Sequence, residues 1–126
     1  MTKTVIPKAA VPTEVPDRVA TYLKEGDLEG VVSMFHPDCR ICFPLDQPPH
    51  IGHEGARSVF SDFVKMKPIL ESKITGEMIA GETTLLQAEW QFKSSDGKVL
   101  AEGNSTEVLK QLSDGSWVYF IDCPLG

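Results

Sequence analysis

Two Asp-Gly pairs constrain the fold of this chain more than any other feature. Asp96-Gly97 and Asp114-Gly115 each lie between runs rich in β-branched and aromatic residues, which is the strongest short-range signal for a β-hairpin. Gly81-Glu82 is a weaker signal of the same kind. The chain from Ile69 onward is therefore predicted to form four consecutive antiparallel strands.

The first half of the chain has a helical pattern instead. Apolar residues recur at helical spacing over 17–25, 28–35 and 54–66, and 40–43 has the pattern of a short strand. Helices followed by a strand meander predict an α+β fold with the helices on one sheet face. We expect one domain over 17–126, preceded by an extended, proline-rich leader over 1–16, and a curved sheet that encloses a pocket for an apolar small molecule.

Treating both Asp-Gly pairs as two-residue turns fixes the register of the sheet. The first hairpin then pairs Trp90 with Gly103, and the second pairs Leu109 with Phe120. Both hairpins agree on which residues share the face beneath the helices. That face is predicted to carry seven apolar residues: Leu86, Ala88, Trp90, Phe92, Leu109, Val118 and Phe120.

Glu107 and Asp122 are direct cross-strand neighbours on this same face. Like charges opposite each other repel, and burial disfavours ionisation further, so at least one carboxyl group should have a raised pKa. Such a pair in an apolar cup is suited to general acid/base work. The alternative is that both carboxylates lie at the wet rim of the cup.

The opposite face of the last hairpin is apolar as well. It is predicted to carry Trp117, Tyr119 and Ile121, and no later segment is available to cover them. A homodimer through this face would bury them. Partial cover by the leader is the alternative.

Composition and charge exclude several classes of function. The net charge is −6 and no Lys/Arg-rich run occurs, which argues against nucleic acid and anionic membranes as partners. No apolar stretch is long enough to span a bilayer, and the N-terminus lacks the apolar centre of a secretory signal, so a cytoplasmic protein is expected. No phosphate loop or dinucleotide fingerprint occurs, so no cofactor is expected.

The cysteines and histidines invite a zinc interpretation. Cys39 and Cys42 are followed by His50 and His53, but strand alternation points the two thiols to opposite faces. We favour free core thiols, with Cys123 as the third, and no metal. His53 remains a candidate titratable group at the mouth of the pocket.

Several motifs resemble one family. The run from Gly26-Asp27 to His36-Pro37-Asp38-Cys39, the segment Ile51-Gly52-His53-Glu54-Gly55, and the terminal stretch from Trp117 to Gly126 are similar to the SnoaL-like, ketosteroid-isomerase-like branch of the nuclear-transport-factor-type superfamily. The resemblance covers roughly residues 17–126. It implies a cone-shaped α+β barrel, usually dimeric, with a deep apolar pocket, in a family of isomerases, cyclases, dehydratases, epoxide hydrolases and binders.

The family's catalytic positions are only partly kept. The position of the isomerase tyrosine falls on Val19 and that of the general-base aspartate on Phe43, so steroid isomerisation itself is not expected. The position of the hydrogen-bonding acid falls on Glu107, which keeps a carboxyl group.

The sequence therefore predicts an acid/base isomerase, cyclase or dehydratase acting on a small carbonyl compound. Glu107 is expected to donate the proton and Asp122 to act as the base, with His53 or Tyr22 assisting. The expected ligand-binding residues are Tyr22, Phe43, Phe60, Trp90, Leu109, Val118 and Phe120. The alternatives are a non-catalytic binding module and a dimerisation domain with a packed interior.

Overall fold

The computed structural model describes residues 6–44 and 46–126 of the chain. It contains three helices and six strands, in the order α1 (Glu14–Glu25), α2 (Leu28–Ser33), β1 (Phe35–Ile41), β2 (His50–Ile51), α3 (Gly52–Lys65), β3 (Ile69–Ala80), β4 (Thr83–Lys93), β5 (Val99–Gln111) and β6 (Trp117–Cys123). None of these helices is both long and apolar enough to cross a membrane.

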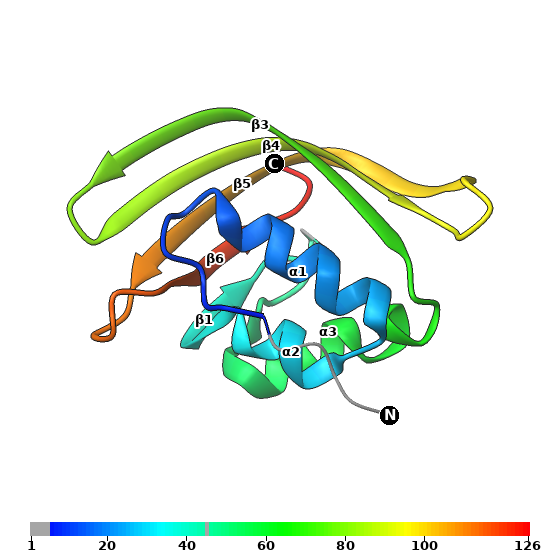
Figure 1. Ribbon diagram of the computed structural model, residues 1–126, viewed down its shortest axis with the longest axis horizontal. Helices are drawn as coiled ribbons and strands as arrows, with labels where there is room; N and C mark the ends of the chain where they lie inside the picture. The colour runs from blue at the N-terminus through cyan, green and yellow to red at the C-terminus, as the bar shows by residue number, and fades with distance from the viewer. Residues whose placement is uncertain (1–5, 45) are drawn as a thin grey trace.

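The strands form one curved sheet in the order β2-β1-β6-β5-β4-β3. The long strands β3, β4 and β5 arch over the helices, which occupy the concave side (Figure 1). The predicted α+β class and the curved sheet around three helices are confirmed. The sheet stays open, with β2 and β3 at its two edges. β1 pairs with β6 in parallel rather than antiparallel, and it covers 35–41 instead of the predicted 40–43.

The helix ends follow from ordinary capping chemistry. Gly26 has a left-handed φ of 69°, and backbone hydrogen bonds to Leu23 and Tyr22 close α1 there. The Asp27 side chain accepts a hydrogen bond from the Gly30 amide, as expected of an N-cap. α1 begins at Glu14 rather than at the predicted position 17. Pro16 lies in its first turn, where backbone N–H groups have no intrahelical partner, so the proline causes no break.

Both Asp-Gly turns are three-residue turns instead of the two-residue turns assumed from the sequence. Gly97 and Gly115 each have a φ of +88°, and the amide–carbonyl pairs Ser94–Lys98 and Leu112–Ser116 close the turns. This geometry adds one residue to each hairpin. A bulge farther along each hairpin then shifts the pairing by one residue, so the strands beyond it have the register that a two-residue turn would give.

These paired irregularities decide which predicted contacts hold. The pairs Trp90–Gly103 and Glu107–Asp122 are confirmed because they lie beyond the bulges. Between the second turn and its bulge the predicted register is wrong by one residue. Leu109 faces Tyr119 rather than Phe120 there.

Because of this one-residue shift, the β6 residues near the turn lie on the face of the sheet opposite to the one predicted. Trp117 and Tyr119 are 5% and 7% exposed within the chain itself, so their predicted place on an uncovered outer face is wrong. The part of the leader that the structure describes contributes to this region. The Ala9 carbonyl accepts a hydrogen bond from the Trp117 amide, and Lys8 pairs with Asp114.

Candidate functional site

A cavity of about 310 Å³ opens between the concave face of the sheet and the helices. This volume lies at the lower end of the range typical for small-molecule pockets, roughly 300–1,000 Å³. Its lining is dominated by aromatic and aliphatic side chains from α1, α3, the strands of the sheet other than β2, and the segments that follow β1 and β6. The lining residues are Pro16, Val19, Phe35, Ile41, Phe43, Val59, Phe60, Phe63, Leu70, Ser72, Ala88, Trp90, Phe92, Ala101, Glu102, Ser105, Glu107, Tyr119, Asp122, Pro124 and Leu125.

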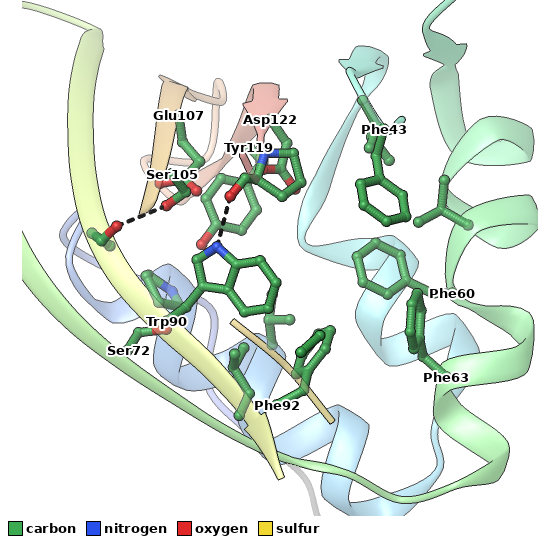
Figure 2. Close-up of a pocket in the computed structure, with 18 of the residues that line it drawn as sticks. Phe43, Phe60, Phe63, Ser72, Trp90, Phe92, Ser105, Glu107, Tyr119 and Asp122 are labelled. Atoms are coloured by element: carbon green, nitrogen blue, oxygen red, sulfur yellow. Dashed lines mark hydrogen bonds between the residues drawn. The ribbon is translucent and has the colours of Figure 1, made fainter. Parts of the chain in front are cut away.

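The polar groups of the cavity are concentrated at one end. Figure 2 shows Glu107, Asp122 and Ser105 together there, while Phe60 and Phe63 of α3 form the opposite wall with Phe43. An elongated apolar molecule could therefore lie against the aromatic wall and present one polar group to the carboxyl end.

Glu107 and Asp122 face each other across β5 and β6. They are 7% and 8% exposed, and a hydrogen bond joins their side chains. Two ionised carboxylates could not share such a bond, so at least one of the two groups carries a proton.

Burial raises the pKa of both groups. The pKa of Glu107 rises from 4.5 to about 7, while hydrogen bonds from Ser105 and Asp122 limit the rise. The pKa of Asp122 lies well above its ordinary value of 3.8 because of burial, the charge of Glu107 and the proton it donates to Glu107. Both carboxyl groups therefore hold their protons to a higher pH than an exposed Glu or Asp side chain does.

Ser105 and Tyr119 complete the polar end. The Ser105 hydroxyl hydrogen-bonds Glu107 and also lies 3.5 Å from the Ala88 carbonyl oxygen, so its single proton serves one acceptor at a time. Burial, together with the neighbouring charges of Glu107 and Asp122, raises the pKa of Tyr119 well above 10.0. Tyr119 is therefore a neutral phenol beside the carboxyl pair.

No lysine, arginine or histidine occurs among the described residues that line the cavity. The carboxyl pair consequently has no counter-ion there, and a negatively charged ligand would meet both repulsion and a desolvation penalty. The arrangement suits a neutral molecule, with one carboxyl group able to donate a proton and the other able to accept one.

The cavity includes five of the ten site residues predicted from the sequence: Phe43, Phe60, Trp90, Glu107 and Asp122. Leu109 is fully buried on the same face but lies outside the lining.

The structure does not bring the other four predicted residues to the cavity. Phe120 occupies the bulge of β6 and lies against Lys110 and His36, while Val118 pairs with Lys110. Their predicted place on the pocket face is wrong because the three-residue turn shifts the register. Tyr22 packs over Gly30. The His53 Nε2 atom lies 2.8 Å from the Phe35 carbonyl oxygen, away from the lining.

Sequence reasoning missed the C-terminal segment of the site. The indole Nε1 of Trp90 donates a 2.7 Å hydrogen bond to the Pro124 carbonyl, and Pro124 and Leu125 line the cavity. Gly103 permits this close packing, because a Cβ atom there would lie 2.8 Å from the Leu125 side chain. The signal available in the sequence was Gly103 itself, a glycine within a strand, which often marks close approach of another segment.

The residues considered for zinc do not form a metal site. Among the described residues, no group of three or more His, Cys, Asp or Glu side chains is placed to hold a metal ion. The Cys39 thiol is buried and donates to the Gly52 carbonyl oxygen. Cys42 instead hydrogen-bonds Cys123.

Comparison with known proteins places this geometry in a family. Residues 17–120 match the family model described as a SnoaL-like domain. No curated protein matches the chain.

Solved structures with the same fold include three with different descriptions. A candidate calcium/calmodulin-dependent protein kinase type II association domain from Thiobacillus denitrificans has a TM-score of 0.75 at 13% identity, over 96% of this chain and 100% of that one. A ketosteroid isomerase-like protein from Erwinia carotovora atroseptica has a TM-score of 0.67 at 15% identity, over 90% of this chain and 92% of that one. A Catenulispora acidiphila protein in complex with S-DNPA has a TM-score of 0.65 at 18% identity, over 87% of this chain and 86% of that one. At these identities the similarity shows the shared fold alone.

Proposed function

Because this chain belongs to the SnoaL-like domain family, we propose that its cavity binds a neutral, apolar carbonyl compound and moves a proton on it. The observation that carries the proposal is the hydrogen-bonded pair of Glu107 and Asp122 at the polar end of an aromatic cavity. A similarly folded protein has been solved with a bound small molecule, which supports the use of this cavity for a ligand.

The two carboxyl groups take different roles in the proposal. Asp122 donates a hydrogen bond to the carbonyl oxygen of the substrate, and the ionised Glu107 removes a proton from the adjacent carbon. The C–H electron pair becomes the C=C bond of an enol, and the carbonyl oxygen takes the Asp122 proton. An isomerisation would be completed when Glu107 returns its proton to a different carbon of the enol and the enol O–H gives its proton back to the Asp122 carboxylate. The C=O bond then re-forms, and both carboxyl groups regain their starting states.

These roles exchange those expected from the sequence. The reason is the direction of the hydrogen bond between the two groups, in which Asp122 donates and Glu107 accepts. A pKa of about 7 also suits Glu107 as a base near neutral pH, because it is ionised in part and still basic enough to accept a proton.

Hydrogen exchange of an aryl ketone tests this function without knowledge of the natural substrate. In D₂O, the protein is expected to accelerate loss of the methyl proton signal of 2-acetylnaphthalene. Glu107→Gln and Asp122→Asn should each slow this exchange by roughly 100-fold or more, in line with the usual contribution of general acid/base groups. Proton NMR measures the rate directly.

Two controls separate catalysis from binding. Glu77→Gln changes an exposed carboxylate outside the lining and should leave the exchange rate unchanged. In thermal-shift assays the neutral ketone should raise the unfolding midpoint and 2-naphthoate should not. Binding of the ketone with an exchange rate that neither variant alters would contradict catalysis and favour the non-catalytic binder. That alternative is supported by Val19 and Phe43, which stand where the resemblance implies catalytic groups.

We also propose a homodimer, through a surface that differs from the predicted one. One apolar row crosses four strands on the outer face of the sheet, because Met78, Leu85, Val108 and Ile121 are successive register partners. Met78 is 70% and Leu85 37% exposed. A second copy, related by a two-fold axis, would cover this row with its own, and the description of one similar structure as an association domain agrees with such a role for the fold.

Analytical ultracentrifugation tests the dimer. The wild-type chain is expected to sediment as a dimer, and Leu85→Lys should shift it to the monomer because a lysine would be buried without a partner. Leu100→Lys is the control, since Leu100 is exposed but lies at the β4–β5 hairpin outside the row. A monomeric wild type, or a dimer unaffected by Leu85→Lys, would contradict the proposal.

A further inference from the structure

Two of the three cysteines lie side by side at the ends of neighbouring strands. β1 and β6 run in parallel, with Ile41 opposite Asp122, and the Cys42 amide donates a 2.8 Å hydrogen bond to the Asp122 carbonyl oxygen. The next position on each strand is a cysteine, so Cys42 and Cys123 are register neighbours. A side-chain hydrogen bond joins their thiols.

This placement satisfies the geometry of a disulfide. Neighbouring strands lie about 4.7–4.9 Å apart, and the Cα atoms of bonded cysteines are usually about 4.4–6.8 Å apart. Ile41 and Asp122 face the interior, so alternation turns the following cysteines toward the other face. Both thiols are partly exposed, whereas the third thiol, Cys39, is fully buried.

We propose that Cys42 and Cys123 form a reversible disulfide by exchange with a small disulfide such as glutathione disulfide. The thiolate of one cysteine attacks the reagent, forms a mixed disulfide and releases one glutathione thiolate. The second cysteine then attacks the protein sulfur of the mixed disulfide and releases the second glutathione. The protein loses two hydrogens and is oxidised, while the reagent is reduced to two thiols.

The effect of Cys42 on the pKa of Cys123 favours reaction of Cys42 first and of Cys123 second. Burial, the hydrogen bond to Cys42 and repulsion from a Cys42 thiolate raise the pKa of Cys123 to about 11. Once Cys42 is held in a mixed disulfide, its hydrogen bond to Cys123 and its charge no longer raise the pKa of Cys123. Cys123 then ionises more readily and can resolve the intermediate.

The disulfide would act on the cavity through the residues that follow each cysteine. Phe43 follows Cys42, and Pro124 and Leu125 follow Cys123, and all three line the cavity. A covalent link between the strand ends would hold these two wall segments at a fixed separation. Formation of the disulfide does not require the proposed proton transfer, because neither cysteine belongs to the lining.

Titration of the intact chain in glutathione redox buffers tests this site. As the buffer becomes oxidising, the number of thiols that react with a chromogenic disulfide under denaturing conditions should fall from three to one, and peptide mapping should find one Cys42–Cys123 link. The unfolding midpoint should rise by roughly 5–10 °C, because the link closes a long loop in the unfolded chain.

Matched variants identify the cysteines involved. Cys39→Ser should retain the link and lose one thiol throughout, whereas Cys42→Ser should abolish the link and the rise in midpoint. Three free thiols in the wild type under oxidising buffer, or stable glutathione adducts without the internal link, would overturn the proposal. The ketone exchange assay on the reduced protein tests the proposed function separately.

Discussion

Raising the pH from 5 to 8 is expected to lower the free energy of unfolding by about 2–3 kcal/mol through Glu107 alone, and the raised pKa of Asp122 adds to this loss. The pKa of Glu107 is about 7 in the folded chain against an ordinary value of 4.5. Between these values the folded state binds more protons than the unfolded state. Stability from this group is therefore fully present below the ordinary pKa and is lost as the pH rises through 7.

Other shifted carboxyl groups act in a different window. The pKa values of Glu14 and Asp114 are lowered, by hydrogen bonds from the Ala10 amide and from Lys8 respectively. Groups of this kind lose their stabilising contribution only as the pH falls below their ordinary values. They therefore do not account for the slope between pH 5 and 8, which we attribute to the buried pair.

Urea unfolding of wild type and Glu107→Gln at several pH values measures the effect. Glutamine can still accept the Asp122 proton, so the variant should unfold cleanly, lose the part of the pH dependence that comes from Glu107, and exceed the wild type in stability at pH 8. The part that comes from Asp122 should remain. Contributions from groups that the two proteins share cancel in the difference between them. Glu102→Gln should keep the wild-type slope. Parallel curves for wild type and Glu107→Gln would contradict the burial of an acid with a raised pKa.

Phe35→Ala is expected to lower the free energy of unfolding by about 3–5 kcal/mol. Phe35 is 2% exposed, and its ring centroid lies 5.5 Å from that of Phe60 and 5.2 Å from that of Tyr119. It therefore belongs to the packed core as well as to the cavity wall. Removal of its ring enlarges a space that the surrounding side chains already fail to fill, so little relaxation can compensate the loss.

Phe43→Ala is the matched change at another position of the same lining. Phe43 is only partly buried and lies beyond the end of β1, so its loss should cost less than about 2 kcal/mol. The same variant should weaken binding of 2-acetylnaphthalene severalfold. Urea unfolding and thermal shift measure the two effects. Equal large losses of stability, with no effect on the ketone, would indicate a packed interior instead of a ligand cavity.

The strand half of this fold could be predicted because its signals are local. An Asp-Gly pair between β-rich runs specifies a hairpin, and alternation then places Trp90 and Glu107 on the concave face. The predicted pairing of Glu107 with Asp122 holds. This pairing holds because a bulge in each hairpin compensates for the extra residue of its three-residue turn. Neither the bulges nor the third turn residue could be recognised in the sequence.

The errors lie where geometry depends on one residue or on distant parts of the chain. The prediction for Tyr119 is wrong because the type of turn at Gly115 decides its face. The parallel pairing of β1 with β6 joins segments far apart in sequence, so no local pattern announces it. The cavity depends on how far the helices stand from the sheet, which is a property of the whole packing. His53 is a residue type suited to proton transfer, but tertiary packing, which the sequence does not show, orients its ring toward the Phe35 carbonyl.

Two buried carboxyl groups hold one proton between them in an apolar cavity, and the proposed chemistry depends on that proton. Carbon-13 NMR of side-chain carboxyl groups, assigned with Glu107→Gln and Asp122→Asn, tests this at the atoms concerned. We expect Glu107 to titrate near pH 7 and Asp122 to stay protonated well above its ordinary pKa of 3.8. Titration of both groups near their ordinary values of 4.5 and 3.8 would contradict the shared proton and, with it, the proposed acid/base site.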